Sequence, residues 1–307
     1  MVVNIAEFDL TCVGDINLDI ITDAIKKYPS KDEQIIVDDI KLNIGGSSAL
    51  CACASSTLGL RTSFIGKCGS DFYSLLLEKL RSYNVHANLS KSERTALTIA
   101  ITFQDGSRSF ITRRGANSEL ELSDINFELI ELSRHLHIAG IWHITRIIPH
   151  IKRILRFAKE HDLTTSLDVG ATIKEENWEI LYDFLRYIDI LFLNELELKF
   201  LTRKNLENGI NELRDKVDIL SIHLGRKGAI TVNKGKIFKS KAFKIKVLNP
   251  TGAGDVFNAG FIYCFLNKKR LDYATKFAIA NASVYITRNW QRFPTINETN
   301  RFLEQQK

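Results

Sequence analysis

Asn249-Pro-Thr-Gly-Ala-Gly-Asp255-Val-Phe-Asn-Ala-Gly260 is the stretch of the chain that says most about its fold. Apolar residues in its second half predict a helix that begins at or just after Gly254. The small residues Gly252, Ala253 and Gly254 let backbone N–H groups converge on an anion at the start of that helix. Asp255 lies in the same turn, where the helix dipole favours an ionised carboxylate.

Two interpretations of Asp255 follow from this stretch. An anion hole beside a fixed carboxylate suits phosphoryl transfer, because the amides stabilise charge on the moving group while the carboxylate takes a proton from the attacking hydroxyl. The other interpretation is a tight turn in which Asp255 only caps the helix. The stretch alone leaves both open.

Upstream of this stretch, short apolar runs alternate with amphipathic segments. Strands are expected at Leu136–Ile141, Thr164–Val169, Asp189–Leu193 and Ile219–Leu224, and helices at Pro149–His161, near Asn177–Arg186 and near Glu212–Val217. A hairpin around Asn233-Lys-Gly235 follows, and helices near Asp255–Leu266, Tyr273–Thr287 and Glu298–Gln305 close the chain. This rhythm predicts an α/β fold with a central, mostly parallel sheet flanked by helices on both faces.

The first third of the chain has a different pattern. Gln34–Leu42 is a strand candidate, and Leu97–Phe103 and Arg108–Thr112 alternate around the turn residues Gln104-Asp-Gly-Ser107. These pieces lack partner helices, so we expect a small antiparallel β-sheet beside the main body. Such a sheet would cover a substrate cleft, a second subunit, or both.

Composition and charge narrow the class of protein. The 307 residues are 45% hydrophobic and 25% charged, which excludes disordered and low-complexity classes. No linker interrupts the chain, so we expect one domain over residues 1–307, with lid strands at about 34–43 and 97–113 inserted in it. The net charge of +6 suits an anionic substrate such as a nucleotide, whereas the basic runs are too short to indicate nucleic-acid binding.

Cysteine and histidine usage argues against a metal site. The five cysteines (Cys12, Cys51, Cys53, Cys68 and Cys264) lack zinc spacing and are expected to be buried and reduced, as in the cytoplasm. We see neither a signal peptide nor a membrane-spanning segment, so no membrane partner is expected. His135 and His137 are expected at the surface or at a strand end.

Thr251 through Asp255 closely resemble the second signature of the ribokinase-like (PfkB) carbohydrate kinase family. The resemblance implies a ribokinase-like fold, ATP as the phosphoryl donor, Mg²⁺ as its partner, Asp255 as the catalytic base, and Gly252, Ala253 and Gly254 as the anion hole. Asn249 and Pro250 replace the leading Asp and Thr of that signature. The resemblance therefore leaves a monovalent-cation requirement open.

Further motifs resemble the family in the family's order. The segments Gly14-Asp-Ile-Asn17-Leu-Asp19, Asn43-Ile-Gly45-Gly46 and Arg114-Gly-Ala-Asn117 are similar to its first-strand motif, its first signature and the segment after the lid hairpin. This similarity implies a substrate-binding set made of Asn17, Asp19, Gly45, Gly46 and Asn117. Gly66-Lys-Cys-Gly69-Ser-Asp71 matches a stretch that is mostly structural in the family.

Two motifs in the second half resemble the family's nucleotide site. Asn194-Glu-Leu-Glu197 matches its Asn-x-x-Glu motif, which implies that Glu197 binds Mg²⁺ through water, although helix caps also have this pattern. Leu224-Gly-Arg-Lys-Gly228 resembles its nucleotide loop, with His223 where the family usually has Thr. The implied nucleotide-binding set is Asn194, His223, Gly225, Gly228 and Asn281.

The favoured hypothesis is ATP-dependent phosphorylation of a primary hydroxyl of a small sugar. A nucleoside kinase of the same family is the alternative, with Leu50, Phe110 or Trp142 as a wall for the base. Leu50 stands where the first signature usually has Asn, and with His223 and Asn249-Pro250 it also supports a non-catalytic nucleotide- or sugar-binding relative. The β lid offers a surface for a homodimer.

Overall fold

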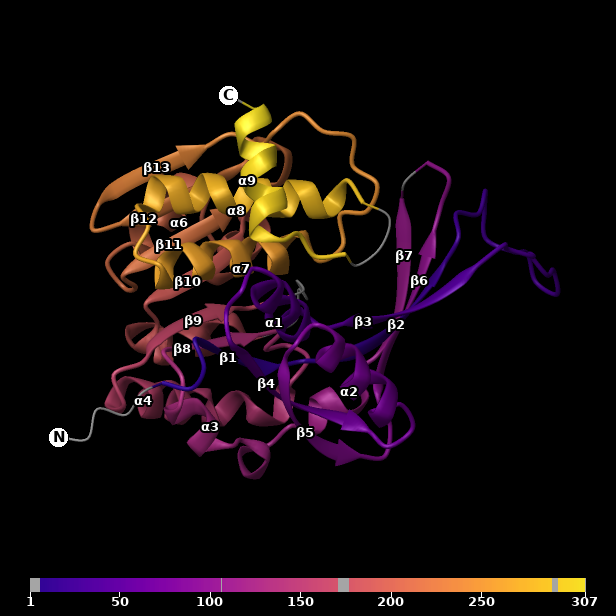
Figure 1. The fold of residues 1–307 in the computed structure, drawn as a ribbon, viewed down its shortest axis with the longest axis horizontal. Helices are drawn as coiled ribbons and strands as arrows, with labels where there is room; N and C mark the ends of the chain where they lie inside the picture. The colour runs from indigo at the N-terminus through magenta and orange to yellow at the C-terminus, as the bar shows by residue number, and fades with distance from the viewer. Residues whose placement is uncertain (1–5, 106, 171–176, 289–291, 307) are drawn as a thin grey trace.

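The computed structural model describes residues 6–105, 107–170, 177–288 and 292–306. In this part of the chain the central sheet has nine strands in the order β13-β12-β11-β10-β9-β8-β1-β4-β5 (Figure 1). They are β13 (Lys236–Ser240), β12 (Ala229–Asn233), β11 (Ile219–His223), β10 (Ile190–Asn194), β9 (Thr164–Asp168), β8 (His135–Ala139), β1 (Leu10–Gly14), β4 (Thr62–Gly69) and β5 (His86–Ser92). Neighbours from β11 to β5 run parallel, and β12 and β13 are antiparallel additions. The expected mostly parallel sheet is confirmed.

Helices cover both faces of the sheet because alternate residues of each strand point to opposite sides. Phe192 of β10 belongs to one core, whereas its neighbours Leu191 and Leu193 belong to the other. The first core is covered by α1 (Ser47–Thr57), α2 (Tyr73–Ser82), α7 (Ala253–Leu266), α8 (Leu271–Ile286) and α9 (Ile296–Gln305). The second is covered by α3 (Phe127–Glu131), α4 (Ile151–Glu160), α5 (Glu195–Thr202) and α6 (Leu206–Leu213) (Figure 1).

Some helix boundaries differ from the expected ones. The helix expected near Asn177–Arg186 is two 3₁₀ helices, η4 (Trp178–Asp183) and η5 (Leu185–Tyr187). The helix expected near Glu212–Val217 begins earlier, because Asn205 caps the backbone N–H of Asn208 and starts α6 there.

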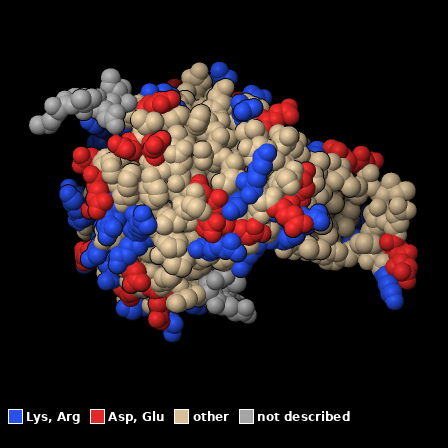
Figure 2. Space-filling model, turned by 90° about the horizontal axis from the view of Figure 1, so that it is seen from below, with Lys and Arg blue, Asp and Glu red and all other residues tan. Residues whose placement is uncertain are grey.

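The lid is a four-stranded sheet in the order β3-β2-β6-β7, with strands β3 (Ile40–Gly45), β2 (Asn17–Thr22), β6 (Ala96–Thr102) and β7 (Arg108–Arg113). It projects from one side of the body (Figure 1, Figure 2). β2 pairs antiparallel with β3 and parallel with β6, so the small sheet is mixed rather than wholly antiparallel. The strand expected over Gln34–Leu42 instead starts at Ile40, and β2 was not predicted as a strand.

The Gly66–Asp71 segment supports the base of the lid, in agreement with its expected structural role. The Asp71 carboxylate accepts a hydrogen bond from the backbone N–H of Thr95 (2.9 Å) and lies 3.7 Å from the guanidinium of Arg113. An added Cβ on Gly69 would lie 2.1 Å from the Thr95 nitrogen, so only glycine fits beside this turn.

The two histidines of β8 do not have the surface position that the sequence suggested. His135 and His137 are fully buried in β8, not at the surface, because each ring is hydrogen-bonded to the Ser166 hydroxyl (both 2.7 Å). Among the described residues no cluster of three potential metal ligands occurs.

All five cysteines are free and buried, as predicted. The helices of the described ranges all fall short of the length and apolar character that crossing a bilayer requires.

Candidate active site

The turn that precedes α7 is held open by glycine. Gly252 has a φ of 79°, and an added Cβ would lie 3.1 Å from Cδ1 of Leu50 and 3.2 Å from the hydroxyl oxygen of Tyr285. The Ala253 N–H makes a 3.3 Å bond to the Pro250 carbonyl within the turn. The backbone N–H groups at the N-terminus of a helix lack intrahelical acceptors, so this turn can bind an anion. α7 starts at Ala253, one residue before the earliest start expected from the sequence.

Asp255 lies in the first turn of α7. Burial raises the pKa of its carboxyl well above the usual range, and the neighbouring carboxyl groups of Asp168 and Asp15 raise this pKa further. The helix N-terminus favours the charged form, but the loss of solvent is the larger influence on this pKa. A carboxylate with a raised pKa is a stronger base than an ordinary aspartate, as general base catalysis near neutral pH requires.

Asp168 is a site residue that the sequence analysis missed. It ends β9 and lies beside Phe192 of β10 and Ala139 of β8. Its carboxylate accepts hydrogen bonds from the Gly170 N–H (2.8 Å) and from the side-chain amide of Asn258 on α7. Its place at the carboxyl end of a parallel strand was the available signal, because clefts in open α/β sheets lie at that edge.

Asp15 is a second missed residue, immediately after β1. Its Oδ1 accepts the backbone N–H of Ser48 (3.0 Å), and an added Cβ on Gly140 would lie 2.3 Å from the same oxygen. Burial raises the pKa of Asp15, an effect that the nearby His143 opposes. The strand β1 and the loop after β8 therefore bring a fixed carboxyl group to the same edge of the sheet as Asp255.

Asn17 and Asn117 meet although 100 residues separate them. The Asn117 amide donates to Oδ1 of Asn17 (2.7 Å), and its own Oδ1 accepts the backbone N–H of Ile16 (3.0 Å). Asn117 is 1% exposed, whereas Asn17 is only half-buried. Asn117 therefore orients the amide of Asn17 at the base of the lid.

Asp19 is placed on β2 directly opposite Asn43 of β3. An added Cβ on Gly45 would lie 2.3 Å from either carboxylate oxygen of Asp19, so this glycine makes room for the acid. Oδ1 of Asp19 and the side-chain nitrogen of Asn43 are buried and have no hydrogen-bond partner in the described chain. Burial, reinforced by Asp15, raises the pKa of Asp19 to about 7. Unpaired buried polar atoms are costly, and a hydroxyl-bearing ligand would satisfy these two.

Asn194 and Glu197 form a capping box at the N-terminus of α5. The Asn194 side chain accepts the N–H of Glu197 (2.9 Å), and Oε2 of Glu197 accepts the N–H of Asn194 (2.7 Å). Burial and the neighbouring Asp168 raise the pKa of Glu197 well above its usual range. Two carboxyl groups that disfavour each other's ionisation suit a hydrated divalent cation, so these residues fit the expected Mg²⁺.

His223 ends β11, beside Asn194 of β10. Its Nδ1 lies 3.5 Å from the position a Cβ would take on Gly254, and its ring contacts Phe257 at 4.4 Å between centroids. Nε2 of His223 is buried without a hydrogen-bond partner in the described chain. Burial lowers the pKa of His223. The imidazole thus lies directly against the anion-binding turn.

The two glycines of the expected nucleotide loop differ in their surroundings. Gly225 (φ 54°) has open space where a Cβ would point, whereas a Cβ on Gly228 (φ 104°) would lie 2.0 Å from the Ser240 carbonyl oxygen. Gly228 therefore lets the loop pack against the chain that leaves β13.

Asn281 and Gly46, both expected to bind a ligand, make close contacts within the protein. Asn281 is fully buried; its amide donates to the Val256 carbonyl (2.9 Å) and its Oδ1 accepts the Thr299 hydroxyl (2.9 Å). These two bonds join α8 to α7 and α9 and leave one N–H donor and one acceptor position of the side chain, so the nucleotide-binding role of Asn281 stays a prediction. Gly46 packs on the backbone of Asp15, with a Cβ position 2.5 Å from its carbonyl oxygen, which is a positioning role.

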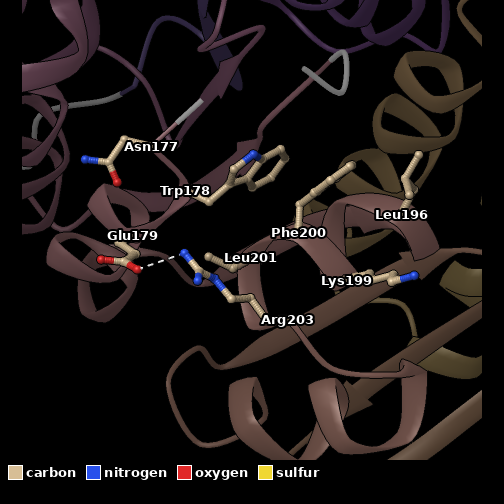
Figure 3. Close-up of a pocket in the computed structure, with 8 residues that line it drawn as sticks. All are labelled: Asn177, Trp178, Glu179, Leu196, Lys199, Phe200, Leu201 and Arg203. Carbon is tan, nitrogen blue, oxygen red and sulfur yellow. Dashed lines mark hydrogen bonds and ion pairs between the residues drawn. The ribbon is translucent and has the colours of Figure 1, made fainter. Parts of the chain in front are cut away.

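A separate cavity of about 590 Å³ opens between η4 and α5 (Figure 3). Its lining comprises Asn177, Trp178, Glu179, Leu196, Lys199, Phe200, Leu201 and Arg203. An ion pair between Arg203 and Glu179 (3.2 Å) crosses it. It contains none of the residues predicted for the site.

Sequence comparisons agree with this geometry. The profile of the pfkB family carbohydrate kinases matches residues 7–296. Ribokinase of Haemophilus influenzae is 26% identical over 96% of this chain and 98% of its own length. A nucleoside kinase of Methanocaldococcus jannaschii is 28% identical over 90% of each chain.

Solved structures show the same fold. Arabidopsis thaliana ribokinase complexed with ribose and ATP has a TM-score of 0.84 and 25% identity, covering 97% of this chain and 99% of its own. A putative ribokinase II from E. coli in complex with ATP and Mg²⁺ has a TM-score of 0.87 at 20% identity, covering 97% and 99%. The chain belongs to the pfkB family of carbohydrate kinases, which are ATP-dependent phosphotransferases with a ribokinase fold.

Proposed function

We propose that this kinase transfers the γ-phosphoryl group of ATP to a primary hydroxyl of a small sugar. The observation that carries the proposal is the position of Asp255, whose pKa is raised by burial at the same turn where Gly252 opens the N-terminus of α7. A strong base and an anion-binding turn in one place are the two requirements of phosphoryl transfer to an alcohol.

Asp255 has the role of general base. Its carboxylate accepts the proton of the attacking hydroxyl, while amides of the Gly252–Gly254 turn stabilise the negative charge on the phosphoryl oxygens. The lid excludes water from the acceptor, which otherwise would compete as the nucleophile.

Asn17, Asp19 and Asn117 are proposed to hold the acceptor. The Asp19 carboxylate accepts hydrogen bonds from sugar hydroxyls, and the Asn17 amide both donates and accepts. The unpaired Oδ1 of Asp19 supports this assignment, because it is an acceptor without a partner, and the absence of a side chain at Gly45 makes room for this carboxylate.

The nucleotide side of the site is assigned to Asn194, Glu197, His223, Gly225, Gly228 and Asn281. Glu197, with Asp168 nearby, would hold Mg²⁺ through water, and bound Mg²⁺ neutralises charge on the nucleotide phosphates. His223 donates to a phosphate oxygen in place of the usual threonine hydroxyl.

The proposal is tested by ADP release with ATP, Mg²⁺ and a panel of free sugars and nucleosides. Ribose and fructose should release ADP faster than adenosine, inosine and cytidine at equal concentration. If only nucleosides release ADP, the sugar assignment is wrong and the kinase assignment stands. If the nucleotide binds but no acceptor is phosphorylated, the chain is a non-catalytic relative.

One observation favours a nucleoside as the second candidate acceptor. Leu50 is 4% exposed, and its Cδ1 lies 3.1 Å from the Cβ position of Gly252, so an apolar side chain lies beside this turn where the family usually has Asn. Trp142 cannot serve as a base-stacking wall, because it is 1% exposed and packs on Trp178 at 5.1 Å. Phe110 on the lid is 54% exposed and is free to contact a base.

We also propose that the lid forms a homodimer interface. Ile40 and Leu42 of β3 and Phe110 and Ile111 of β7 are exposed by 44–63%; β3 and β7 are the two edge strands of the lid, and exposed apolar edge strands can pair with a second copy of the chain. Light scattering of the chain and of a Leu42→Asp, Ile111→Asp variant tests this; a monomeric unmodified chain would refute it. Five buried thiols fit a reducing compartment, so we propose the cytoplasm.

A further inference from the structure

Residues 219–254 contain one arginine and seven lysines but neither aspartate nor glutamate. Apart from Lys227, which is paired with Glu195 (3.3 Å), the exposed lysines of this stretch are the six residues Lys234, Lys236, Lys239, Lys241, Lys244 and Lys246. None of them forms an ion pair with another described residue, although ion pairs are frequent elsewhere. Asp272, the acid that shares a hollow with Lys239, is paired with Arg270 (2.9 Å). We call these six residues the lysine strip.

Lys241, Lys244 and Lys246 of the strip lie along the chain that joins the two halves of the proposed nucleotide site, whereas Lys234 and Lys236 lie at the far end of β13, beside Asn233. At one end, Gly228 packs on Ser240, with only 2.0 Å between its Cβ position and the carbonyl oxygen. At the other end, the N–H groups of Leu248 and Asn249 donate to the Ile286 carbonyl (2.8 and 3.2 Å), just before the anion-binding turn. In Figure 1 this orange segment runs from β13 past α9 toward α7.

The backbone of the strip is anchored while its charges stay in solvent. The ring of Phe243 packs edge-on against Phe302 of α9, with 5.1 Å between centroids, and Ile245 is half-buried. Lys244 and Lys246 alternate with these residues and are exposed. An extended chain with alternate residues anchored points its remaining side chains outward in one direction.

Protection of the exposed sheet edge against aggregation explains only part of the lysine strip. Lysines on an exposed edge strand discourage sheet-to-sheet aggregation, which explains Lys236 and Lys239 on β13. Lys241, Lys244 and Lys246 lie beyond the end of β13 at Ser240, where there is no edge to protect. On the face seen in Figure 2, by contrast, basic and acidic side chains are interleaved. Helix α4 has this pattern, with Lys159 bound to Asp189 (2.7 Å).

We propose that Lys241, Lys244 and Lys246 of the lysine strip capture the polyphosphate of the incoming nucleoside triphosphate and guide it to the turn before α7. The inference rests on the proposed function of that turn. A row of unpaired charges of one sign raises the local concentration of an oppositely charged ligand and its association rate by about 10–10³-fold at low salt. Its reach is about 10 Å at 0.1 M ionic strength, so charges adjoining the site act on the ligand.

The test is stopped-flow association of a fluorescent N-methylanthraniloyl derivative of ATP with the full chain. The variant is Lys244→Glu with Lys246→Glu, and its matched control is Lys152→Glu with Arg153→Glu on α4, which makes the same change in net charge at exposed positions. We expect the strip variant to associate about tenfold more slowly at 20 mM salt and to approach the unmodified chain at 0.5 M. The dissociation rate and kcat should be unchanged, and the control should stay within twofold.

Equal association rates for the strip variant and the unmodified chain would overturn the inference and leave the proposed function intact. An equal slowing in the α4 control would also overturn it, because net charge alone would then be responsible. If mixed-sequence DNA bound the unmodified chain and not the strip variant, with ATP association unaffected, the strip would be a nucleic-acid surface instead. Failure of the unmodified chain to bind the nucleotide at all would refute the proposed function itself.

Discussion

Arg108 of the lid strand β7 donates a hydrogen bond to the hydroxyl of Thr251, in the turn that precedes α7. The two residues are 143 positions apart in sequence, and their contact joins the lid to the proposed anion hole. Burial lowers the pKa of the Arg108 guanidinium. The position of the lid is therefore coupled to the turn that would receive the phosphoryl group.

The first prediction is that Arg108→Gln loosens the lid. A lost hydrogen bond to a charged donor is worth about 1.5–3 kcal/mol, so kcat/KM for the acceptor should fall by about 10–100-fold. ADP release without acceptor should rise relative to release with it, because water gains access. Both rates are measured in one coupled assay. Arg94→Gln, at an exposed position beside the lid, is the control and should behave as the unmodified chain. An unchanged acceptor kcat/KM would make the contact irrelevant to closure.

The second prediction concerns Asp255→Asn, which removes the base and keeps the shape of the turn. Turnover should fall by about 10²–10⁴-fold, while ATP binding measured by calorimetry changes little. The matched control is Asp272→Asn, since Asp272 also lies in the first turn of a helix, α8, but is remote from the cleft. Near-normal turnover of a folded Asp255→Asn protein would reduce Asp255 to a helix-capping residue.

The parts of the fold that could be predicted are those whose signals are local. Apolar runs at Asp189–Leu193 and Ile219–Leu224 identify buried parallel strands, and Gln104–Ser107 identifies the β6–β7 hairpin, without reference to distant residues. β2 (Asn17–Thr22) could not be predicted. Its buried positions do not alternate regularly along the strand, and Asp19 lies in its middle.

The site residues that were not predicted are brought together by contacts between distant parts of the chain. Asp15 and Asp168 come from strands far apart in sequence, and only the parallel sheet brings their carboxyl groups to one edge. His137 illustrates the reverse case: a polar residue on a strand looks exposed until Ser166 of the neighbouring strand supplies its hydrogen bond. The family resemblance contributed Asn17 and Asp19, whose pattern alone indicates no more than a turn.

The third prediction is that Glu197→Gln raises the Mg²⁺ concentration needed for half-maximal rate. A neutral amide holds hydrated Mg²⁺ less well than a carboxylate, and a several-fold increase is expected. Glutamine preserves the capping box with Asn194, so α5 should remain folded. The control is Glu195→Gln, which lies in the same helical turn but is exposed and paired with Lys227 (3.3 Å). Indistinguishable Mg²⁺ titrations for the two variants would leave Glu197 with a capping role only.

The fourth prediction is that the Asp19 carboxylate, which is positioned to bind the acceptor, destabilises the folded chain at neutral pH in the absence of ligand. Its pKa is raised from 3.8 to about 7 in the folded chain, so the folded state holds a proton that the unfolded state releases. Its destabilising contribution is therefore absent below pH 4, grows between pH 4 and 7, and is complete above pH 7, where it is of the order of a few kcal/mol.

Asp19→Asn removes this contribution while keeping the size of the side chain. Between pH 5 and pH 8 the melting temperature of the variant should fall less than that of the unmodified chain. In the absence of ligand the variant should be the more stable protein at pH 8. Its kcat/KM for the acceptor should fall by at least tenfold at pH 8, because the ionised hydrogen-bond acceptor is gone. The comparison is made by calorimetric melting at both pH values and by the ADP-release assay. Asp39→Asn, exposed next to the lid strand β3, is the control and should show neither change. Parallel pH dependence of melting in the Asp19 variant and the unmodified chain would mean that Asp19 is already ionised in the free protein, and that its unpaired oxygen costs the fold nothing.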